Sequence, residues 1–300
     1  MAKFNAPDPR NDGTMVWVNG LVQRENAGVS PLDSVVQGGD AVWEGLRVRE
    51  GRVLQFAEHF RRLRDSAKAL AFSEIPSEEE VWTAVAQTLA ANQMRDGVHI
   101  RLTLTRGRKS TSGMDPRLNV FGPTLIVLPE YKGRVYGDEG LTLVTASIRR
   151  NAPSFLDSKI HHNNLLNNIL AKIEANVAGA DDALMLDERG FIAETNATNI
   201  FLVRDGVLFT PHATACLPGL TRQFVLASAQ ELGLPHQAAD LSLSQLYAAD
   251  EAFATGTMGD LAHISYADGR CIGTQMGPMT TLLQAHYQNH IGRTGRPIDI

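Results

Sequence analysis

The irregular order of strand-like and helix-like segments constrains the fold of this chain more than any other feature. In the first half, alternating or continuous apolar residues predict strands at residues 15–19, 53–56, 99–107 and 124–130. Helical spacing of apolar residues predicts helices at 56–70 and 76–94, and Ser77 and Glu80 form a capping-box pattern at the start of the second helix. Since the segments do not alternate as regular β-α-β units, we expect an α+β fold.

The second half continues this mixture. The pair Asp205-Gly206 separates two apolar runs and is typical of a hairpin turn. The other predicted elements are strands at 141–150, 182–188 and 252–257 and helices at about 162–177, 221–233 and 277–292.

The length of the chain indicates two domains, because a single hydrophobic core stops growing near 300 residues. Residues 131–140 are polar and contain glycine between two apolar segments, which is typical of a linker. We therefore expect a small N-terminal domain at 1–130, a linker at 131–140 and a larger C-terminal domain at 141–300. The polar loop at 108–122 is a candidate for a mobile segment near a site.

The composition excludes several classes of function. A net charge of −5 and a pI near 6.0 argue against nucleic-acid binding, which needs clustered Lys and Arg. The two cysteines, Cys216 and Cys271, do not require an oxidising compartment. The start of the chain lacks an apolar signal region, and no stretch reaches the roughly 18 apolar residues of a membrane span. We expect a cytoplasmic protein that does not enter a membrane.

Lys159 stands apart from the other five lysines because it follows the apolar pair Phe155-Leu156 and precedes a predicted helix. A lysine in a partly desolvated cleft loses proton affinity and can form a Schiff base with an aldehyde cofactor. The alternative is a lysine at a helix start that faces water, and sequence statistics alone favour it. The neighbouring pair His161-His162 predicts no metal site, because adjacent helical residues point to different faces.

Three segments downstream could form a binding site. Glu194 ends a short predicted strand, where an acid can face a cleft. A Pro-Gly turn leads into a helix whose first residues, Leu220 and Thr221, offer backbone N–H groups to an anion. A second turn of small residues at 255–259 brings Thr257 within reach of a phosphate. The alternative for the two turns is an ordinary helix start and an ordinary turn.

Six segments, taken in order, resemble the class IV pyridoxal-phosphate aminotransferases, the fold-type IV family. They are WEGLR at 43–47, EHFRRLRDSAKAL at 58–70, SKIHHNN at 158–164, ETNATNIF at 194–201, LPGLTR at 217–222 and TGTMG at 255–259. The family includes branched-chain and D-amino-acid aminotransferases, (R)-selective amine transaminases and aminodeoxychorismate lyase. The resemblance implies a small α/β domain, a larger domain with a β-barrel-like core, and a homodimer.

The resemblance also implies roles for individual residues. Lys159 matches the lysine that binds pyridoxal 5′-phosphate covalently and shuttles the substrate proton. Glu194 matches the acid beside the pyridine nitrogen, where a carboxylate keeps that nitrogen protonated. Arg62 matches the phosphate ligand, and its guanidinium suits a doubly charged phosphate. The alternative for Arg62 is an arginine on the surface of a helix.

Further cofactor contacts follow from the same motifs. Leu220 and Thr221 match the backbone contacts to the phosphate, while Gly256 and Thr257 match the turn that holds it from the other side. Asn164 stands where a tyrosine often bonds the phenolic oxygen of the cofactor, and an amide can donate the same hydrogen bond. The resemblance implies no metal ion.

The expected substrate contacts are Gly38, Trp43, His99, Arg101 and Met258. Branched-chain enzymes typically place tyrosines where this chain has Gly38 and His99, so a larger and more polar pocket is expected. Trp43 could refill this space, although core packing is the more common role of such a residue. Arg101 matches an arginine near the substrate carboxylate, with a surface arginine at a strand edge as the alternative.

The function that the resemblance implies is a transaminase with ping-pong kinetics. L-branched-chain amino acids with 2-oxoglutarate are the expected substrates, because this activity is the commonest in the family. The alternatives are D-amino acids or (R)-amines with pyruvate, a lyase that releases pyruvate, and a binding protein that keeps the fold without catalysis.

Overall fold

The computed structural model describes residues 8–133, 135–137, 139–293 and 295–298. Within these ranges the chain forms two compact units. The first unit contains residues 8–133, 160–164, 291–293 and 295–298, and the second contains 135–137, 139–159 and 165–290. Among the described residues, no helix combines the length and the apolar character needed to cross a membrane.

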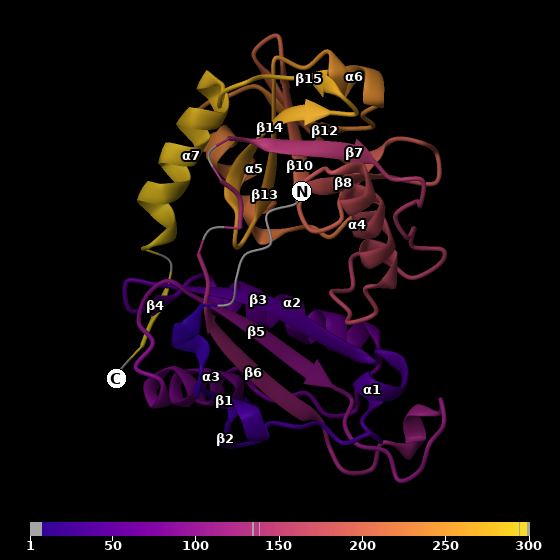
Figure 1. Ribbon diagram of the computed structural model, residues 1–300, viewed down its shortest axis with the longest axis vertical. Coiled ribbons are helices and arrows are strands. Elements are labelled where there is room, and N and C mark those ends of the chain that lie inside the picture. Colours follow the sequence, from indigo (N-terminus) through magenta and orange to yellow (C-terminus); the bar gives the residue numbers. More distant parts are fainter. Residues whose placement is uncertain (1–7, 134, 138, 294, 299–300) are drawn as a thin grey trace. The chain divides into compact units, whose positions relative to one another are not determined.

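The first unit is built on a seven-stranded sheet with the order β16-β4-β3-β5-β6-β1-β2 (Figure 1). Its strands are β1 (Met15–Val18), β2 (Leu21–Gln23), β3 (Ala41–Arg49), β4 (Arg52–Val53), β5 (Val98–Thr105), β6 (Thr124–Tyr131) and β16 (Arg296–Pro297). Its helices are α1 (Ser34–Gly38), α2 (Phe56–Ala69) and α3 (Glu78–Ala91), with short 3-10 turns η1 (Pro9–Asn11), η2 (Arg24–Asn26) and η3 (Pro116–Leu118).

One face of this sheet packs against α2 and α3. Apolar residues of α2 recur at helical spacing, and they share one buried cluster with residues of α3 and with alternate residues of β3 and β5. The predicted capping box is confirmed, because the Ser77 hydroxyl accepts a hydrogen bond from the Glu80 amide while the Glu80 carboxylate accepts one from the Ser77 amide. The two predicted helices are therefore confirmed, with slightly shorter ends.

The other face of the same sheet carries the intervening residues. In the antiparallel register of β3 and β5, Gly45 lies opposite Arg101 and Trp43 lies opposite Thr103. Because side chains alternate across a strand, Trp43, His99 and Arg101 point away from the buried cluster formed with α2 and α3. This alternation gathers several of the expected substrate contacts on one face.

The second unit contains a nine-stranded sheet with the order β12-β11-β10-β13-β14-β7-β8-β9, and β15 pairs with β14 (Figure 1). Its strands are β7 (Leu141–Thr145), β8 (Asp182–Leu186), β9 (Ile192–Thr195), β10 (Asn199–Arg204), β11 (Val207–Pro211), β12 (His236–Ala239), β13 (Glu251–Gly256), β14 (Asp260–Ala267) and β15 (Arg270–Cys271). Its helices are α4 (Leu166–Ala178), α5 (Leu220–Glu231), α6 (Leu243–Tyr247) and α7 (Pro278–Ile291).

This sheet curls back on itself, because β9 at one end also contacts β10 and β11 near the other end. Parallel and antiparallel pairs are mixed within it. The hairpin predicted at Asp205-Gly206 is confirmed, and both residues have positive φ, as a tight two-residue turn requires. The expected α+β fold with a barrel-like core is confirmed.

The helix predicted at about 162–177 begins later, at Leu166. The backbone before it pairs with β3 instead: the Trp43 amide donates to the His161 carbonyl oxygen, and the Asn163 amide donates to that of Ala41. These hydrogen bonds hold residues 161–163 in an extended strand-like segment. A pairing with a strand more than 100 residues away overrides the local helical pattern.

Candidate functional site

Lys159 lies at the end of a loop in the second unit, directly before the segment 160–164. Its Nζ atom lies 3.1 Å from Asp157 Oδ1 and 3.4 Å from the carbonyl oxygen of Thr214. The side chain is 41% exposed, which agrees better with the water-facing alternative than with a buried cleft. Asp157 and Thr214 orient the amine, while its exposure leaves it accessible to a small molecule.

Glu194 lies at the end of β9 and is buried. Arg150 Nε donates to Glu194 Oε1 at 2.7 Å, whereas the Asn199 amide nitrogen and the Leu217 backbone amide lie 3.3 Å from Oε2. Burial raises the pKa of the Glu194 carboxyl above its ordinary value, although the Arg150 guanidinium acts in the opposite direction. Oε2 is thus held only by long hydrogen bonds and can accept a stronger one.

Arg150 and Asn199 were missed as individual site residues. Asn199 donates to the carbonyl oxygen of Leu217 at 2.8 Å, and its own oxygen accepts a hydrogen bond from the Gly219 amide at 3.2 Å. A Cβ atom at Gly219 would lie 2.2 Å from that oxygen, so only glycine allows this approach. Asn199 was visible in the ETNATNIF motif, but its partners could not be deduced from spacing.

The start of α5 fits an anion. Gly219 is the N-cap residue and no side chain caps the helix, so the first backbone N–H groups have no partner within it. Leu220 and Thr221, the first two residues of α5, are buried. The partial positive charge of a helix N-terminus attracts phosphate and carboxylate groups. Asn199 and Leu217 connect this helix start to Glu194.

The expected contacts Gly256, Thr257 and Met258 lie at the end of β13 and in the turn after it. Thr255 of β13 pairs with Asn199 of β10. A Cβ atom at Gly256 would lie 3.3 Å from the Thr198 side chain, so this turn packs against the residues that follow Glu194. The second unit therefore brings Lys159, Glu194, the start of α5 and the turn after β13 around the segment 214–221.

Arg62 belongs to the first unit, on α2. Its Nε and Nη2 atoms donate to the two carboxylate oxygens of Glu44 at 2.8 and 2.7 Å. The Arg62 side chain is only 13% exposed, so the alternative of a surface arginine is wrong. Glu44 also lies 2.6 Å from Nδ1 of His59 and 3.1 Å from Nδ1 of His161. Glu44 therefore fixes the orientation of the Arg62 guanidinium.

The charges of this cluster are balanced. Burial alone would raise the pKa of the Glu44 carboxyl, but Arg62 and His161 hold it well below its usual range. Burial lowers the pKa of His161 to about 4, so its imidazole is neutral at physiological pH. Glu44 and Arg62 are therefore the charged pair, and the His161 ring completes the cluster without adding charge.

Trp43 and Arg101 form a stacked pair on the sheet face away from α2 and α3. The guanidinium carbon of Arg101 lies 3.3 Å from the centroid of the Trp43 ring, and its Nη2 donates to Asn163 Oδ1 at 2.8 Å. The His161 ring lies 4.1 Å from the Trp43 ring. The core-packing role expected for Trp43 is wrong, because alternation places it on the opposite face. The strand-edge alternative for Arg101 is also wrong, because β5 lies between β3 and β6.

The remaining expected contacts also lie in the first unit. The ring of His99 sits against Gly45, and burial lowers the pKa of His99 to about 4, so it is neutral. A Cβ atom at Gly38 would meet no atom within 4 Å, which shows open space beside this residue. Asn164 packs against Gly39, the left-handed residue that ends α1. His99 therefore contributes polarity without charge.

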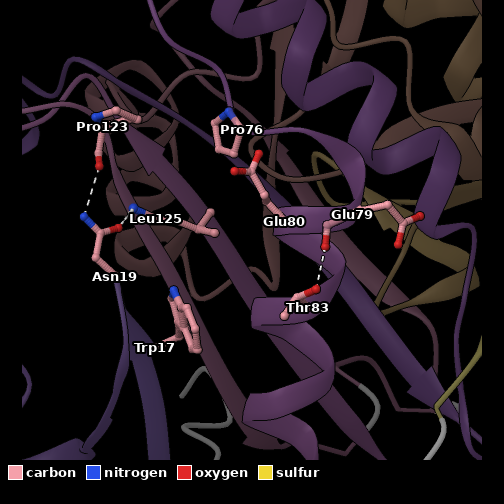
Figure 2. Close-up of a pocket in the computed structure, with 8 residues that line it drawn as sticks. All are labelled: Trp17, Asn19, Pro76, Glu79, Glu80, Thr83, Pro123 and Leu125. Carbon is pink, nitrogen blue, oxygen red and sulfur yellow. Dashed lines mark hydrogen bonds between the residues drawn. The ribbon is translucent and has the colours of Figure 1, made fainter.

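A pocket of about 520 Å³ lies elsewhere in the first unit (Figure 2). None of the expected site residues lines it. Its two carboxylates already have structural roles, since Glu80 caps α3 and Glu79 pairs with Arg296. Asn19 is held by Pro123, as the dashed line in Figure 2 marks. This pocket lacks the acid, amine and anion contacts that the second unit gathers.

Known proteins similar to this chain agree with these features. The profile of the family described as amino-transferase class IV matches residues 41–266. The chain is 54% identical over 295 residues to branched-chain-amino-acid aminotransferase-like protein 2 of Arabidopsis thaliana, a match that covers 97% of this chain and 53% of that protein. It is 38% identical over 277 residues to a putative branched-chain-amino-acid aminotransferase of Methanocaldococcus jannaschii, covering 91% of this chain and 95% of that protein.

A solved structure shows the same fold. The branched-chain amino acid aminotransferase of T.th., complexed with N-(5′-phosphopyridoxyl)-L-glutamate, has a TM-score of 0.87 and 33% sequence identity. The match covers 95% of this chain and 96% of that one. It confirms the fold-type IV architecture implied by the sequence motifs. This chain spans about half the length of the Arabidopsis thaliana relative.

Proposed function

This chain belongs to the class IV aminotransferase family, and from this premise we propose that it is a pyridoxal-phosphate-dependent transaminase. One observation carries the proposal: Lys159, the buried Glu194 and the uncapped start of α5 converge on the segment 214–221 of the second unit. A reactive amine, an acid and an anion-binding helix start are the three contacts that an aldehyde with a ring nitrogen and a phosphate needs.

The residues of the chain fit this cofactor. Oε2 of Glu194 has only long hydrogen bonds to Asn199 and Leu217, which leaves it able to accept a hydrogen bond from a protonated pyridine nitrogen. The N-terminus of α5 offers backbone N–H groups to a phosphate. Arg62, oriented by Glu44, is the proposed guanidinium ligand of the same phosphate.

The chemistry divides between the cofactor and the protein. When bound, pyridoxal phosphate supplies the electron sink that stabilises negative charge at the substrate Cα. Lys159 Nζ holds the cofactor and then takes the proton from the substrate Cα. Arg150 keeps a positive charge beside Glu194, which favours the carboxylate that holds a proton on the ring nitrogen. Asn199 keeps Glu194 and the start of α5 in register.

The proposed substrates are L-branched-chain amino acids and 2-oxoglutarate. Two observations support this choice: the relatives are named as branched-chain aminotransferases, and the solved T.th. relative is complexed with a phosphopyridoxyl derivative of L-glutamate. Arg101 is the proposed ligand of a substrate carboxylate, since Asn163 and Trp43 hold its guanidinium in one orientation. Burial lowers the pKa of Arg101 to about 10, so it stays charged at neutral pH.

A substrate panel tests this proposal. We expect L-leucine, L-isoleucine and L-valine with 2-oxoglutarate to show the highest kcat/KM, and double-reciprocal plots to give parallel lines, as ping-pong kinetics requires. The measurement compares these pairs with D-alanine and (R)-1-phenylethylamine against pyruvate. A higher kcat/KM for either of the latter would replace the L-branched-chain assignment. Pyruvate release from 4-amino-4-deoxychorismate without an amino acceptor would indicate the lyase.

We also propose that the chain forms a homodimer in the cytoplasm. The support comes from α4, on which Leu166, Ile169, Leu170, Ile173 and Val177 form an apolar stripe at helical spacing. These side chains are between 48% and 85% exposed within the single chain. An exposed apolar stripe of this length is typical of a surface that a partner covers.

Replacing Ile173 with glutamate is expected to shift the protein from dimer to monomer, because the new carboxylate would be desolvated in the contact. Light scattering coupled to size exclusion measures the mass. The matched control is Val36→Glu, an exposed apolar residue on α1 of the first unit that should leave the mass unchanged. A dimeric mass for Ile173→Glu would rule out α4 as the contact surface.

A further inference from the structure

Two histidines and a glutamate converge outside the residues discussed above. Within the described ranges, Glu231, His286 and His290 are the one group of three such side chains whose possible ligand atoms all lie within 4.8 Å of one another. Glu231 is the last residue of α5, and the two histidines are four residues apart on α7. Because residues four apart share a helix face, α7 presents both imidazoles on the same side.

The two imidazoles are arranged like a chelate. Their ring centroids lie 4.0 Å apart with an angle of 25° between the planes. His290 Nδ1 lies 2.8 Å from the carbonyl oxygen of His286, so the natural tautomer places the proton on Nδ1. A backbone carbonyl that binds one imidazole nitrogen leaves Nε2 as a lone-pair donor, which is the arrangement common in metal-binding histidines.

His286 faces the carboxylate. Its Nε2 lies 3.4 Å from Glu231 Oε2, yet it is buried and makes no hydrogen bond with any residue that the structure describes. The side chain of His286 is only 11% exposed. A buried nitrogen without a hydrogen bond, beside a carboxylate at ion-pair distance, suits a cation placed between the two atoms.

The surroundings favour a positive ion. Glu231 adds its charge to the negative end of α5, whose last turn contains no basic residue. Phe224 stands behind the imidazoles, with ring centroids 6.0 Å from His286 and 6.4 Å from His290. An apolar wall on one side limits the access of water and strengthens the attraction between the ligands and a cation.

From this geometry we propose that Glu231, His286 and His290 form a binding site for one divalent transition-metal ion, with Zn²⁺ as the best match. Imidazole and carboxylate ligands bind Zn²⁺ at about 2.0–2.2 Å, which brings tetrahedral ligand atoms to roughly 3.3–3.6 Å from one another. The ligand atoms here each need to move by about one ångström or less to reach that separation. Glu231 can make this adjustment because its side chain is 66% exposed.

The site takes three protein ligands and leaves one position for water. Metal binding at this site would join the end of α5 to α7, whereas the proposed cofactor contacts lie at the start of α5. We therefore assign the ion a structural role that is independent of the transaminase chemistry. Bound metal should raise the thermal stability of the second unit, because an ion that binds only the folded state stabilises it.

Calorimetric titration tests the site. The untagged holoenzyme, treated with a chelator and dialysed into a buffer without phosphate, is titrated with ZnCl₂. We expect one Zn²⁺ per chain and a rise in Tm. Co²⁺ should give the visible absorption of a four-coordinate ion. His290→Gln and Glu231→Gln should each weaken binding by about tenfold or more, since even the loss of a residue that supports a ligand costs ten- to a hundredfold.

His212→Gln is the matched control, because His212 is an exposed histidine in the same unit. It should bind Zn²⁺ like the unchanged protein. Circular dichroism and the metal-free Tm show whether each variant is folded, and Glu231→Gln changes only an exposed side chain. Absence of one-to-one Zn²⁺ binding, or equal binding by the folded variants of His290 and Glu231, would overturn the assignment. Transaminase activity does not enter the test, so its outcome is separate from that of the proposed function.

Discussion

Replacing Lys159 with alanine is expected to abolish transamination, with kcat reduced by roughly 10⁴-fold or more. The change removes both the amine that holds the cofactor and the base that moves the substrate proton, and loss of a general base alone costs about 10²–10⁴-fold. The proposal rests on the position of Nζ beside Asp157 and Thr214. Neither of these contacts can replace the amine as a nucleophile.

Single-turnover kinetics of L-leucine with the cofactor-loaded protein measures this effect. Borohydride treatment followed by mass spectrometry should place a cofactor adduct on Lys159 of the unchanged protein and none in the variant. The control is Lys68→Ala, since Lys68 is an exposed lysine on α2 whose loss should leave kcat unchanged. Turnover that survives in Lys159→Ala, or an adduct on another lysine, would contradict the proposed role.

Replacing Glu194 with glutamine is the second large effect, with an expected loss of about 10²–10³-fold in kcat. The amide has no negative charge to keep the ring nitrogen protonated, and removing one preorganised electrostatic contact typically costs this much. The rate of Cα deprotonation, measured with α-deuterated L-leucine, should fall more than the affinity for the cofactor. This difference separates a role in the chemistry from a role in binding.

The same substitution has a structural consequence. Arg150 donates to Glu194 inside the second unit, so a neutral side chain leaves a buried guanidinium without its counter-charge. The free energy of unfolding should therefore also fall, and urea titration measures it. Glu188→Gln, an exposed residue before the same strand, is the control and should change neither quantity. A variant with unchanged deprotonation rate would refute the pairing of Glu194 with the ring nitrogen.

Local patterns in the sequence predicted much of the secondary structure. The helices at 56–70 and 76–94 and the hairpin at Asp205-Gly206 depend on contacts within a few residues, such as the capping box of Ser77 and Glu80. Such signals are complete in a short window, so they survive whatever the rest of the chain does. The segment before α4 is the exception, because β3 pairs with its backbone and prevents a helix there.

The motifs also led to the family, but they did not predict how the residues hold one another. Arg150 contacts Glu194 across 44 residues, and Asn163 contacts Arg101 across 62. Trp43 was expected to pack in a core, yet the register of β3 places it on the opposite face, under Arg101. These partnerships depend on strand order and register, which a single sequence does not display.

The sequence by itself determined where strands, helices and turns begin, because backbone preferences and apolar periodicity act over a few residues. It also determined the family, since six short motifs occur in their expected order. Only the tertiary structure decided which charges share a buried contact and which surface groups meet, as His286, His290 and Glu231 do across 55 residues. The physical reason is that burial and electrostatic pairing depend on distance in space, and folding makes that distance nearly independent of separation along the chain.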